Sequence, residues 1–135
     1  MLKRVHGMSI LLDTQILIWF INGSDNIPRK IKMIIDDPRS DIYVSIASIW
    51  EIVLKMNINK LTLTCHFDEL FEIIISSNFQ VVPIKEKHLR AYLYLPLIHR
   101  DPYDRILVST AISENLRLIT SDKVNQQYDV DWIWE

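Results

Sequence analysis

Four acidic residues from distant parts of the sequence could form a metal site: Asp13, Glu51, Asp104 and Asp122. Four carboxylates brought together would repel one another unless cations lie between them. Carboxylate oxygens select hard cations, so we expect one or two Mg²⁺ or Mn²⁺ ions. Such ions can clamp a phosphate and lower the pKa of an attacking water. The residue types therefore suit hydrolysis of a phosphodiester.

The elements that would position these acids alternate along the chain. Strands are predicted at residues 9–12, 42–45, 80–82, 117–119 and 130–132, where short runs of mostly apolar residues occur. Helices are predicted at residues 16–21, 28–35, 67–77, 85–95 and 102–114, with a further helix from Ser45 or Ser48 to about Met56. Short strands that alternate with helices and are apolar on both faces predict an α/β domain. Its short, mostly parallel sheet would be flanked by helices on both faces.

In parallel sheets, ligands bind outside the carboxyl ends of the strands. Asp13 directly follows the first predicted strand, and Asp122 follows the strand at 117–119. Glu51 lies in the first turns of the helix after the second strand, and Asp104 lies in the first turn of its own helix. We therefore expect the four carboxylates to converge at one edge of the sheet.

Each acid also has a simpler explanation. Glu51 precedes Lys55 by one helical turn, which suits a surface ion pair. Asp122 could cap a short helix that follows it. Asp13 is the hardest to explain structurally, because an acid between two apolar runs is expensive to bury without a partner. A role in a site is therefore favoured for Asp13.

The sequence "DPYDR" contains Asp104 and a further acid, Asp101. Asp101 followed by Pro102 is a typical helix start, so capping is the favoured role of Asp101, with an auxiliary role at the site as the alternative. For Asp104, stabilisation of the helix N-terminus and metal binding are equally good explanations.

Composition narrows the class of protein. The 135 residues suffice for one domain, and 49% of them are hydrophobic, enough for a core. The net charge of −2 argues against binding nucleic acid by bulk positive charge. The single cysteine, Cys65, cannot form an internal disulfide framework, and no apolar run approaches the roughly 18 residues of a membrane span. We expect a cytoplasmic protein without a membrane segment.

Residues 1–7 would be a short extension, with Met8 as an alternative start, before a domain at 8–135.

Several stretches resemble the PIN-domain family, and most closely the VapC-like toxins of type II toxin–antitoxin pairs. They are "LLDTQILIWFING", "IYVSIASIWEIVLKMNINKL", "HRDPYDRILVSTAISENLRLITSD" and the closing "YDV". The resemblance implies a metal-dependent ribonuclease that a cognate antitoxin inhibits, and it implies a homodimer. Matched residue by residue, its acidic site falls on Asp13, Glu51, Asp104 and Asp122. The chain departs from many relatives at Gln15, where histidine is frequent, and at Asn59, where glycine is frequent.

Other residues near the acids have two interpretations each. His99 could carry a proton, although a structural role is more usual for a lone histidine. Arg100 and Arg105 could contact RNA phosphates or could be solvated surface residues. Thr120 and Ser121 could hydrogen-bond a ligand water or form a turn. Most aromatic residues should lie in the core, with one face of the Trp132–Trp134 end exposed.

Two other functions fit parts of the pattern. A phosphate-accepting receiver domain would need paired acids near the start and an aspartate ending a middle strand, whereas "IYVS" ends in serine. A PIN-like module that binds RNA or protein without cleaving RNA is the main alternative, and the presence of all four acids argues against it.

Overall fold

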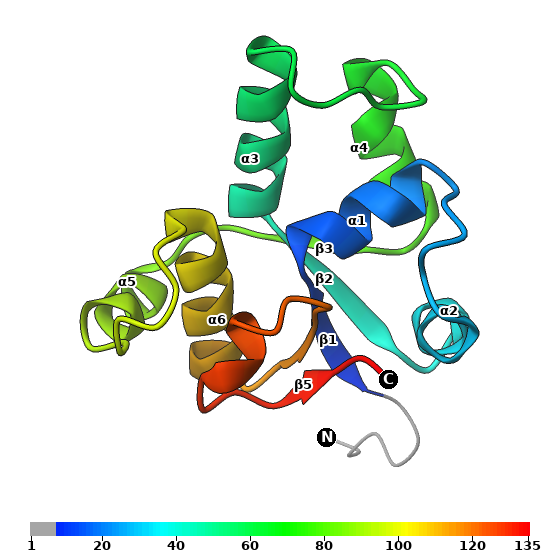
Figure 1. Ribbon diagram of the computed structural model, residues 1–135. Coiled ribbons are helices and arrows are strands. Elements are labelled where there is room, and N and C mark those ends of the chain that lie inside the picture. Colours follow the sequence, from blue (N-terminus) through cyan, green and yellow to red (C-terminus); the bar gives the residue numbers. More distant parts are fainter. Residues whose placement is uncertain (1–7) are drawn as a thin grey trace.

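A parallel sheet forms the centre of the molecule (Figure 1). The computed structural model describes residues 8–135, and the extension predicted at residues 1–7 lies outside the described residues. The strands are β1 (Ser9–Leu12), β2 (Asp41–Ser45), β3 (Gln80–Val82), β4 (Arg117–Ile119) and β5 (Trp132–Ile133). Their order is β3-β2-β1-β4-β5, and every neighbouring pair is parallel. The predicted α/β fold with a mostly parallel sheet is confirmed.

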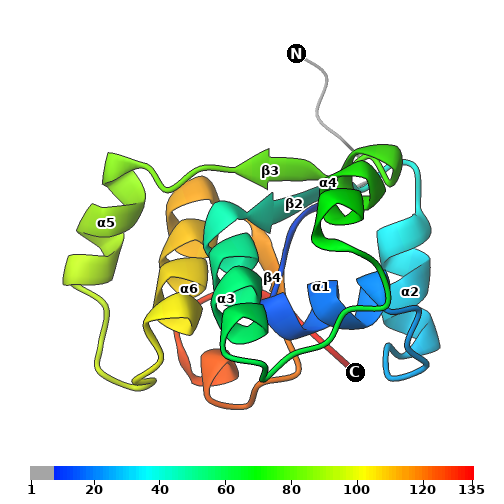
Figure 2. The ribbon, with the colours of Figure 1, turned by 90° about the horizontal axis from the view of Figure 1, so that it is seen from above.

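Helices cover both faces of this sheet, as predicted. They are α1 (Thr14–Ile21), α2 (Arg29–Asp36), α3 (Ile46–Asn57), α4 (Phe67–Ser76), α5 (Glu86–Leu93) and α6 (Pro102–Glu114), followed by a 3-10 helix, η1 (Asn125–Gln127). Figures 1 and 2 show α5 and α6 on one side of the sheet, and α1, α2 and α4 on the other. Within residues 8–135, no helix has the length and apolar character needed to cross a membrane.

The central strand β1 divides the hydrophobic core into two parts. Successive side chains of a strand point to opposite faces, so Ile10 and Leu12 pack with the larger cluster, which includes residues of α1, α2, α3 and α4. Leu11 packs on the other face against α6 and Tyr128. All three side chains are fully buried. The run "ILL" therefore fixes β1 between two layers of helices and fixes where Asp13 emerges from it.

Polar side chains define the ends of the helices that matter for the site. Asp13 and Ser45 cap α1 and α3, and each accepts a hydrogen bond from the backbone N–H two residues further on. Helix α1 thus begins at Thr14, two residues earlier than the predicted start at Ile16. Asn115 ends α6 with φ of 57°, and Asn59 follows α3 with the same φ. Asparagine tolerates this left-handed conformation, so Asn59 can occupy the position where the family resemblance leads us to expect glycine.

Arg105 is buried, so both interpretations of this residue from the sequence were wrong. Its guanidinium donates hydrogen bonds to the carbonyls of Pro96 and His99 and to the hydroxyl of Tyr128, at 2.9, 3.4 and 3.2 Å. It also lies over the ring of Tyr92, 4.8 Å from the ring centroid. Arg105 therefore ties the loop before α6 to the body of the domain and does not face solvent.

Helix α5 is shorter than predicted and is attached to the end of α6. His88 is fully buried, and its Nδ1 accepts a hydrogen bond from the backbone N–H of Lys85. Its Nε2 therefore carries the proton in the neutral ring, and it donates to Glu114 at 2.6 Å. Lys87 also pairs with Glu114, at 2.9 Å. Hydrogen bonds from Lys87 and His88 hold the pKa of Glu114 at about 2.

The aromatic residues follow the prediction in part. Trp19 and Trp134 pack against each other with ring centroids 6.2 Å apart, and both lie at the edge of the larger core. Trp132 is partly exposed. Trp50 departs from the expected core position, because 59% of it is exposed beside the ring of Tyr103.

Candidate active site

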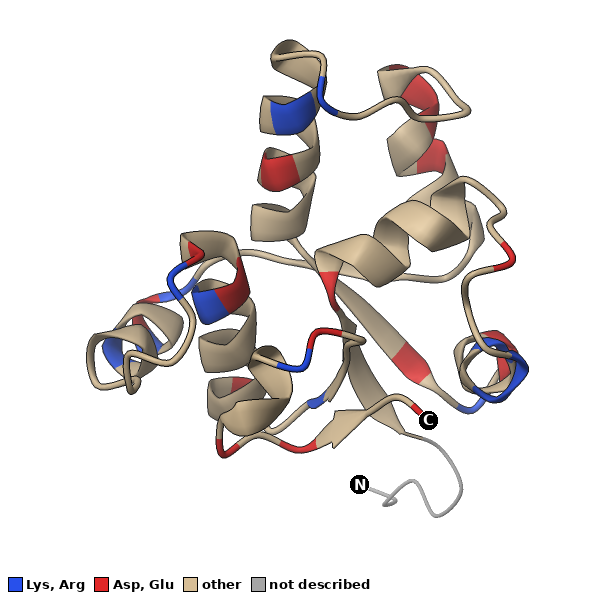
Figure 3. Cartoon of the chain, in the orientation of Figure 1, with Lys and Arg blue, Asp and Glu red and all other residues tan. Residues whose placement is uncertain are grey.

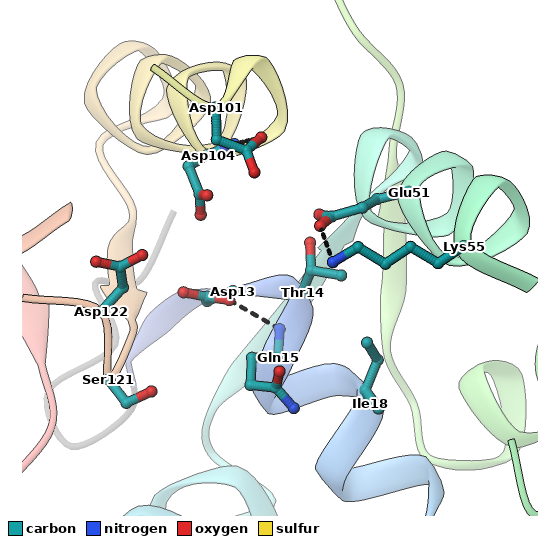
Figure 4. A pocket seen from close by; sticks show the side chains of 10 residues that line it. All are labelled: Asp13, Thr14, Gln15, Ile18, Glu51, Lys55, Asp101, Asp104, Ser121 and Asp122. Atoms are coloured by element: carbon teal, nitrogen blue, oxygen red, sulfur yellow. Dashed lines mark hydrogen bonds and ion pairs between the residues drawn. The ribbon is translucent and has the colours of Figure 1, made fainter. Parts of the chain in front are cut away.

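The structure brings the four predicted acids around one cavity (Figure 4). The cavity has a volume of about 340 Å³. Its lining residues are Asp13, Thr14, Gln15, Ile18, Glu51, Lys55, Asp101, Asp104, Ser121 and Asp122. They come from the junction of β1 and α1, from α3, from the start of α6 and from the loop after β4. Figure 3 shows, in red, acidic segments on α3, at the start of α6 and in the loop after β4.

Asp13 lies at the floor of this cavity, where only 4% of the residue is exposed. One carboxylate oxygen accepts a hydrogen bond from the backbone N–H of Gln15 at 2.8 Å, and the other accepts one from the hydroxyl of Thr120 at 2.5 Å. Burial raises the pKa of Asp13, while these hydrogen bonds oppose the shift. Asp13 therefore caps α1 and also faces the cavity, whereas the sequence analysis predicted only its role in a site.

Glu51 faces the cavity from α3 and is paired there with Lys55. Lys55 Nζ lies 2.7 Å from Glu51 Oε2, and Glu51 is 6% exposed. The pKa of Lys55 is raised, chiefly by its hydrogen bond to Glu51. Helix α3 is also tied to α1, because Thr14 donates a hydrogen bond to Ser48 at 2.9 Å. The ion pair expected from the spacing is present, but it lies at the cavity and not on the open surface.

Asp101 and Asp104 have different roles at the start of α6. Asp101 Oδ1 accepts hydrogen bonds from the backbone N–H groups of Tyr103 and Asp104, at 2.8 and 3.4 Å, which confirms Asp101 as the cap. Asp104 instead accepts a hydrogen bond from the side chain of Asn125 at 2.9 Å. Burial raises the pKa of Asp104 to about 7, and the charges of Asp13 and Asp101 add to this effect.

Asp122 contacts both η1 and His99. Its Oδ1 accepts the backbone N–H of Val124 at 2.8 Å, which closes a turn just before η1. Because η1 begins without a side-chain cap, the alternative explanation of Asp122 as a helix cap was wrong. Its Oδ2 lies 3.1 Å from His99 Nε2, and Asp104 Oδ2 lies 3.4 Å from the same nitrogen. The N–H of Asp101 donates to the other ring nitrogen, Nδ1, at 3.1 Å. Because Nδ1 is an acceptor, the proton of the neutral ring is on Nε2, and His99 donates to these carboxylates.

Two further residues organise the site behind the cavity. Thr120, which the sequence analysis left with two interpretations, bonds directly to Asp13 and accepts the backbone N–H of Asp122 at 3.1 Å. Asn125 is fully buried and reaches Asp104, and it was not predicted. No signal in "KVNQQY" distinguishes it from a loop residue, because its function depends on a tertiary contact with α6. Gln15 and Ser121 line the cavity and are placed to contact a ligand.

The donor set suits a hard divalent cation. Four carboxylates face a small volume, and Lys55, the cation among the lining residues, is already paired with Glu51. Oxygen ligands of this kind match Mg²⁺ and Mn²⁺. The residues present therefore fit a metal site in which Asp13, Glu51, Asp104 and Asp122 would be the ligands. Asp101 is committed to capping α6, which leaves it an auxiliary position at the rim.

The protein thus belongs to the class of parallel α/β domains with an acidic cavity at the carboxyl edge of the strands, where ligands of such sheets bind. Comparison with protein families places the chain within this class: it belongs to the PIN domain family, whose model matches residues 10–132. A search of curated proteins found no match.

Solved structures with the same fold support this assignment. A chain of the VapBC2 structure from Rickettsia felis, bound to a DNA fragment from its promoter, is 19% identical with a TM-score of 0.71, and the match covers 95% of this chain and 100% of that one. A chain of VapBC-1 from nontypeable Haemophilus influenzae is 19% identical with a TM-score of 0.65, covering 93% and 97%. A chain of FitAcB from Neisseria gonorrhoeae is 20% identical with a TM-score of 0.59, covering 92% and 96%. At these identities the likeness is one of fold.

Proposed function

We propose that this protein is a metal-dependent endoribonuclease and the toxin of a type II toxin–antitoxin pair. PIN domains are in general nucleases that use divalent metal. The observation that carries the proposal is the convergence of Asp13, Glu51, Asp104 and Asp122 on one cavity at the sheet edge. The similar structures are described as VapBC and FitAB assemblies, which supports a toxin with a cognate antitoxin.

In this reaction, the side chains of the protein would bind the metal ions and orient the carboxylates that hold them. The four acids would bind one or two Mg²⁺ or Mn²⁺ ions, and bound cations would supply a water of lowered pKa and stabilise charge on the phosphate. Thr120 and the N–H of Gln15 fix the orientation of the Asp13 carboxylate. Lys55 lines the cavity beside Glu51, so we expect it to contact the phosphate of a bound RNA. Arg100 is exposed next to Asp101, so it stays a candidate contact for RNA.

The test of this function compares Asp104→Asn and Asp13→Asn with wild type on a mixed pool of structured RNAs, with Mg²⁺, with Mn²⁺ and with a chelator. We expect wild type to cut RNA only with a divalent cation, and each variant to lose at least about 100-fold in rate, because an amide replaces a charged ligand. Asp25→Asn is the matched control, since Asp25 is exposed in the loop after α1. If folded wild type binds RNA in a salt-dependent way but does not cleave it, the nuclease function is wrong and the non-cleaving RNA-binding module is favoured.

The antitoxin is the second part of the proposal. An acidic cavity open to solvent can accept a basic side chain from an inhibitor as readily as a metal ion. We expect the protein to purify as a stable complex when co-expressed with the product of the adjacent gene, and we expect this complex to lose RNA cleavage. Action on RNA in this system would take place in the cytoplasm.

A further inference from the structure

Behind the acidic cavity, one buried amide joins two of its walls. Asn125 is fully buried in η1, and its Nδ2 donates to Asp104 Oδ1 at 2.9 Å. The same nitrogen lies 3.5 Å from Asp13 Oδ2 and 3.5 Å from Thr120 Oγ1. The amide has two N–H groups, so it can donate one to Asp104 on α6 and the other to Asp13 at the end of β1 at the same time.

This position is chemically unfavourable for an asparagine unless its N–H groups are needed. The carbonyl oxygen Oδ1 is buried and has no hydrogen-bond partner among the described residues. A buried acceptor without a partner costs about 1–3 kcal/mol, so an apolar residue of the same shape would avoid this cost. The donor side of the amide, which faces the acids, accounts for the presence of an asparagine here.

The charge of the group matters as much as its hydrogen bonds. A lysine or arginine at this position would neutralise Asp13 and Asp104 and would compete with a metal ion, and an aspartate would add to the repulsion. A neutral donor holds two carboxylates close together and leaves their negative charge for a cation. His99 acts in a comparable way between Asp104 and Asp122, through its Nε2–H.

We propose that Asn125 is a positioning residue that sets the spacing of the Asp13 and Asp104 carboxylates for cation binding. This inference rests on the proposed metal-dependent function of the site. Asn125 does not line the cavity, so it acts through the two acids and not by contact with substrate.

The test measures Mn²⁺ affinity directly by isothermal titration calorimetry without RNA, and RNA cleavage as a function of Mn²⁺ concentration. Asn125→Leu keeps the shape and removes both donors. We expect Mn²⁺ to bind this variant at least 10-fold more weakly than wild type. Cleavage should fall by a similar factor at low Mn²⁺ and recover toward the wild-type kcat at saturating Mn²⁺. A residue that only supports the fold would not show recovery with metal.

Gln126→Leu is the matched control. Gln126 lies in the same 3-10 helix and donates to the backbone carbonyl of Thr120 at 2.9 Å, so its loss weakens the anchoring of η1 without touching an acid. We expect its Mn²⁺ affinity to stay within about 3-fold of wild type. Equal losses in Gln126→Leu and Asn125→Leu would overturn the inference.

A second variant protects the test against misfolding. Asn125→Ser is smaller, and its hydroxyl is too short to reach Asp104, so it should also bind Mn²⁺ more weakly. Wild-type affinity for Mn²⁺ in a folded Asn125→Ser or Asn125→Leu protein would overturn the inference. Failure of both variants to fold would also overturn it, because Asn125 would then be a residue of the core. If wild type itself neither binds Mn²⁺ nor cleaves RNA, the proposed function fails, and Asn125 loses its role with it.

Discussion

Asp104 links the charge state of the site to the stability of the fold. Its pKa is raised to about 7 by burial and by neighbouring negative charge, and the pKa of Asp13 is raised as well. A carboxyl whose pKa is higher in the folded state than in the unfolded state binds protons preferentially when folded. Its contribution to stability is complete below the unfolded pKa of about 4 and is lost as pH rises through about 7.

We therefore predict that the metal-free protein unfolds more easily at pH 8 than at pH 5. Urea titrations in the presence of a chelator would measure this difference. Added Mg²⁺ or Mn²⁺ should restore stability at pH 8, because the cation replaces the protons between the carboxylates.

Asp104→Asn supplies the control for this prediction, since the amide does not titrate. Its stability should change less between pH 5 and pH 8 than that of wild type, and it should gain less from Mn²⁺. A wild-type protein whose metal-free stability rises over this interval would contradict the assignment of a raised pKa.

At the scale of elements, α6 depends on Asp101 for its first turn. The side chain accepts two backbone N–H groups of that turn. Replacing a capping residue by alanine costs about 0.5–2 kcal/mol, whereas asparagine is an equally good cap. Asp101→Ala should therefore lower the free energy of unfolding by this amount, and Asp101→Asn should leave it nearly unchanged.

The same pair of variants separates capping from metal binding. If Asp101 serves only α6, Asp101→Asn retains RNA cleavage within a few-fold of wild type. If Asp101→Asn is as inactive as Asp104→Asn while remaining folded, Asp101 is a ligand and not an auxiliary acid.

Arg105 holds the loop before α6, so we predict a stability defect and not a defect in RNA binding. Removing its guanidinium would leave the carbonyls of Pro96 and His99 without this donor, at about 1–3 kcal/mol for each group that stays buried. Arg105→Lys cannot replace the planar fork and should unfold at lower urea concentration. Arg100→Lys, at an exposed neighbouring position, is the control and should unfold like wild type.

The elements were easier to predict than the site. Short apolar runs identified β1, β3 and β4 with their observed bounds. The run is most continuous in β1, because this strand is buried on both faces. The parallel sheet then placed Asp13, Glu51 and Asp122 at one edge. Arg105 and Asn125 were misassigned or missed, because their partners lie in loops and helices whose packing no local pattern encodes. The start of α1 was placed too late, since the capping role of Asp13 was not considered beside its role in the site.

At the scale of the molecule, an apolar surface lies between α3, α5 and the start of α6. It is a groove of about 300 Å³ lined by Ala47, Trp50, Ile84, Leu89, Tyr92, Pro102, Tyr103 and Ile106. Beyond it, α5 exposes 73% of Leu93. A two-fold dimer would cover these apolar side chains in both copies at once, because a two-fold interface uses the same surface of each copy. We propose that a second copy of the chain covers this surface, in line with the homodimer that the family resemblance implies.

Sedimentation analysis of Leu93→Glu tests this proposal. We predict that wild type is a dimer and that Leu93→Glu is largely monomeric, because a charge would be buried in the interface. Ile75→Glu is the matched control: Ile75 is 72% exposed on α4, away from this surface, and its charge should leave the dimer intact. A monomeric wild-type protein would contradict the proposed interface.

The order of strands in the sheet determines when the site can form during translation. Strand β1 lies between β2 and β4, and β4 is synthesised only after the six described α-helices that follow β1. Thr120, which bonds to Asp13, is translated 107 residues after it, and Asp122 and Asn125 follow. A nascent chain that stops before β4 therefore has neither a complete sheet nor a complete acidic cavity. The acidic site can therefore assemble only after the segment with Thr120, Asp122 and Asn125 has been translated.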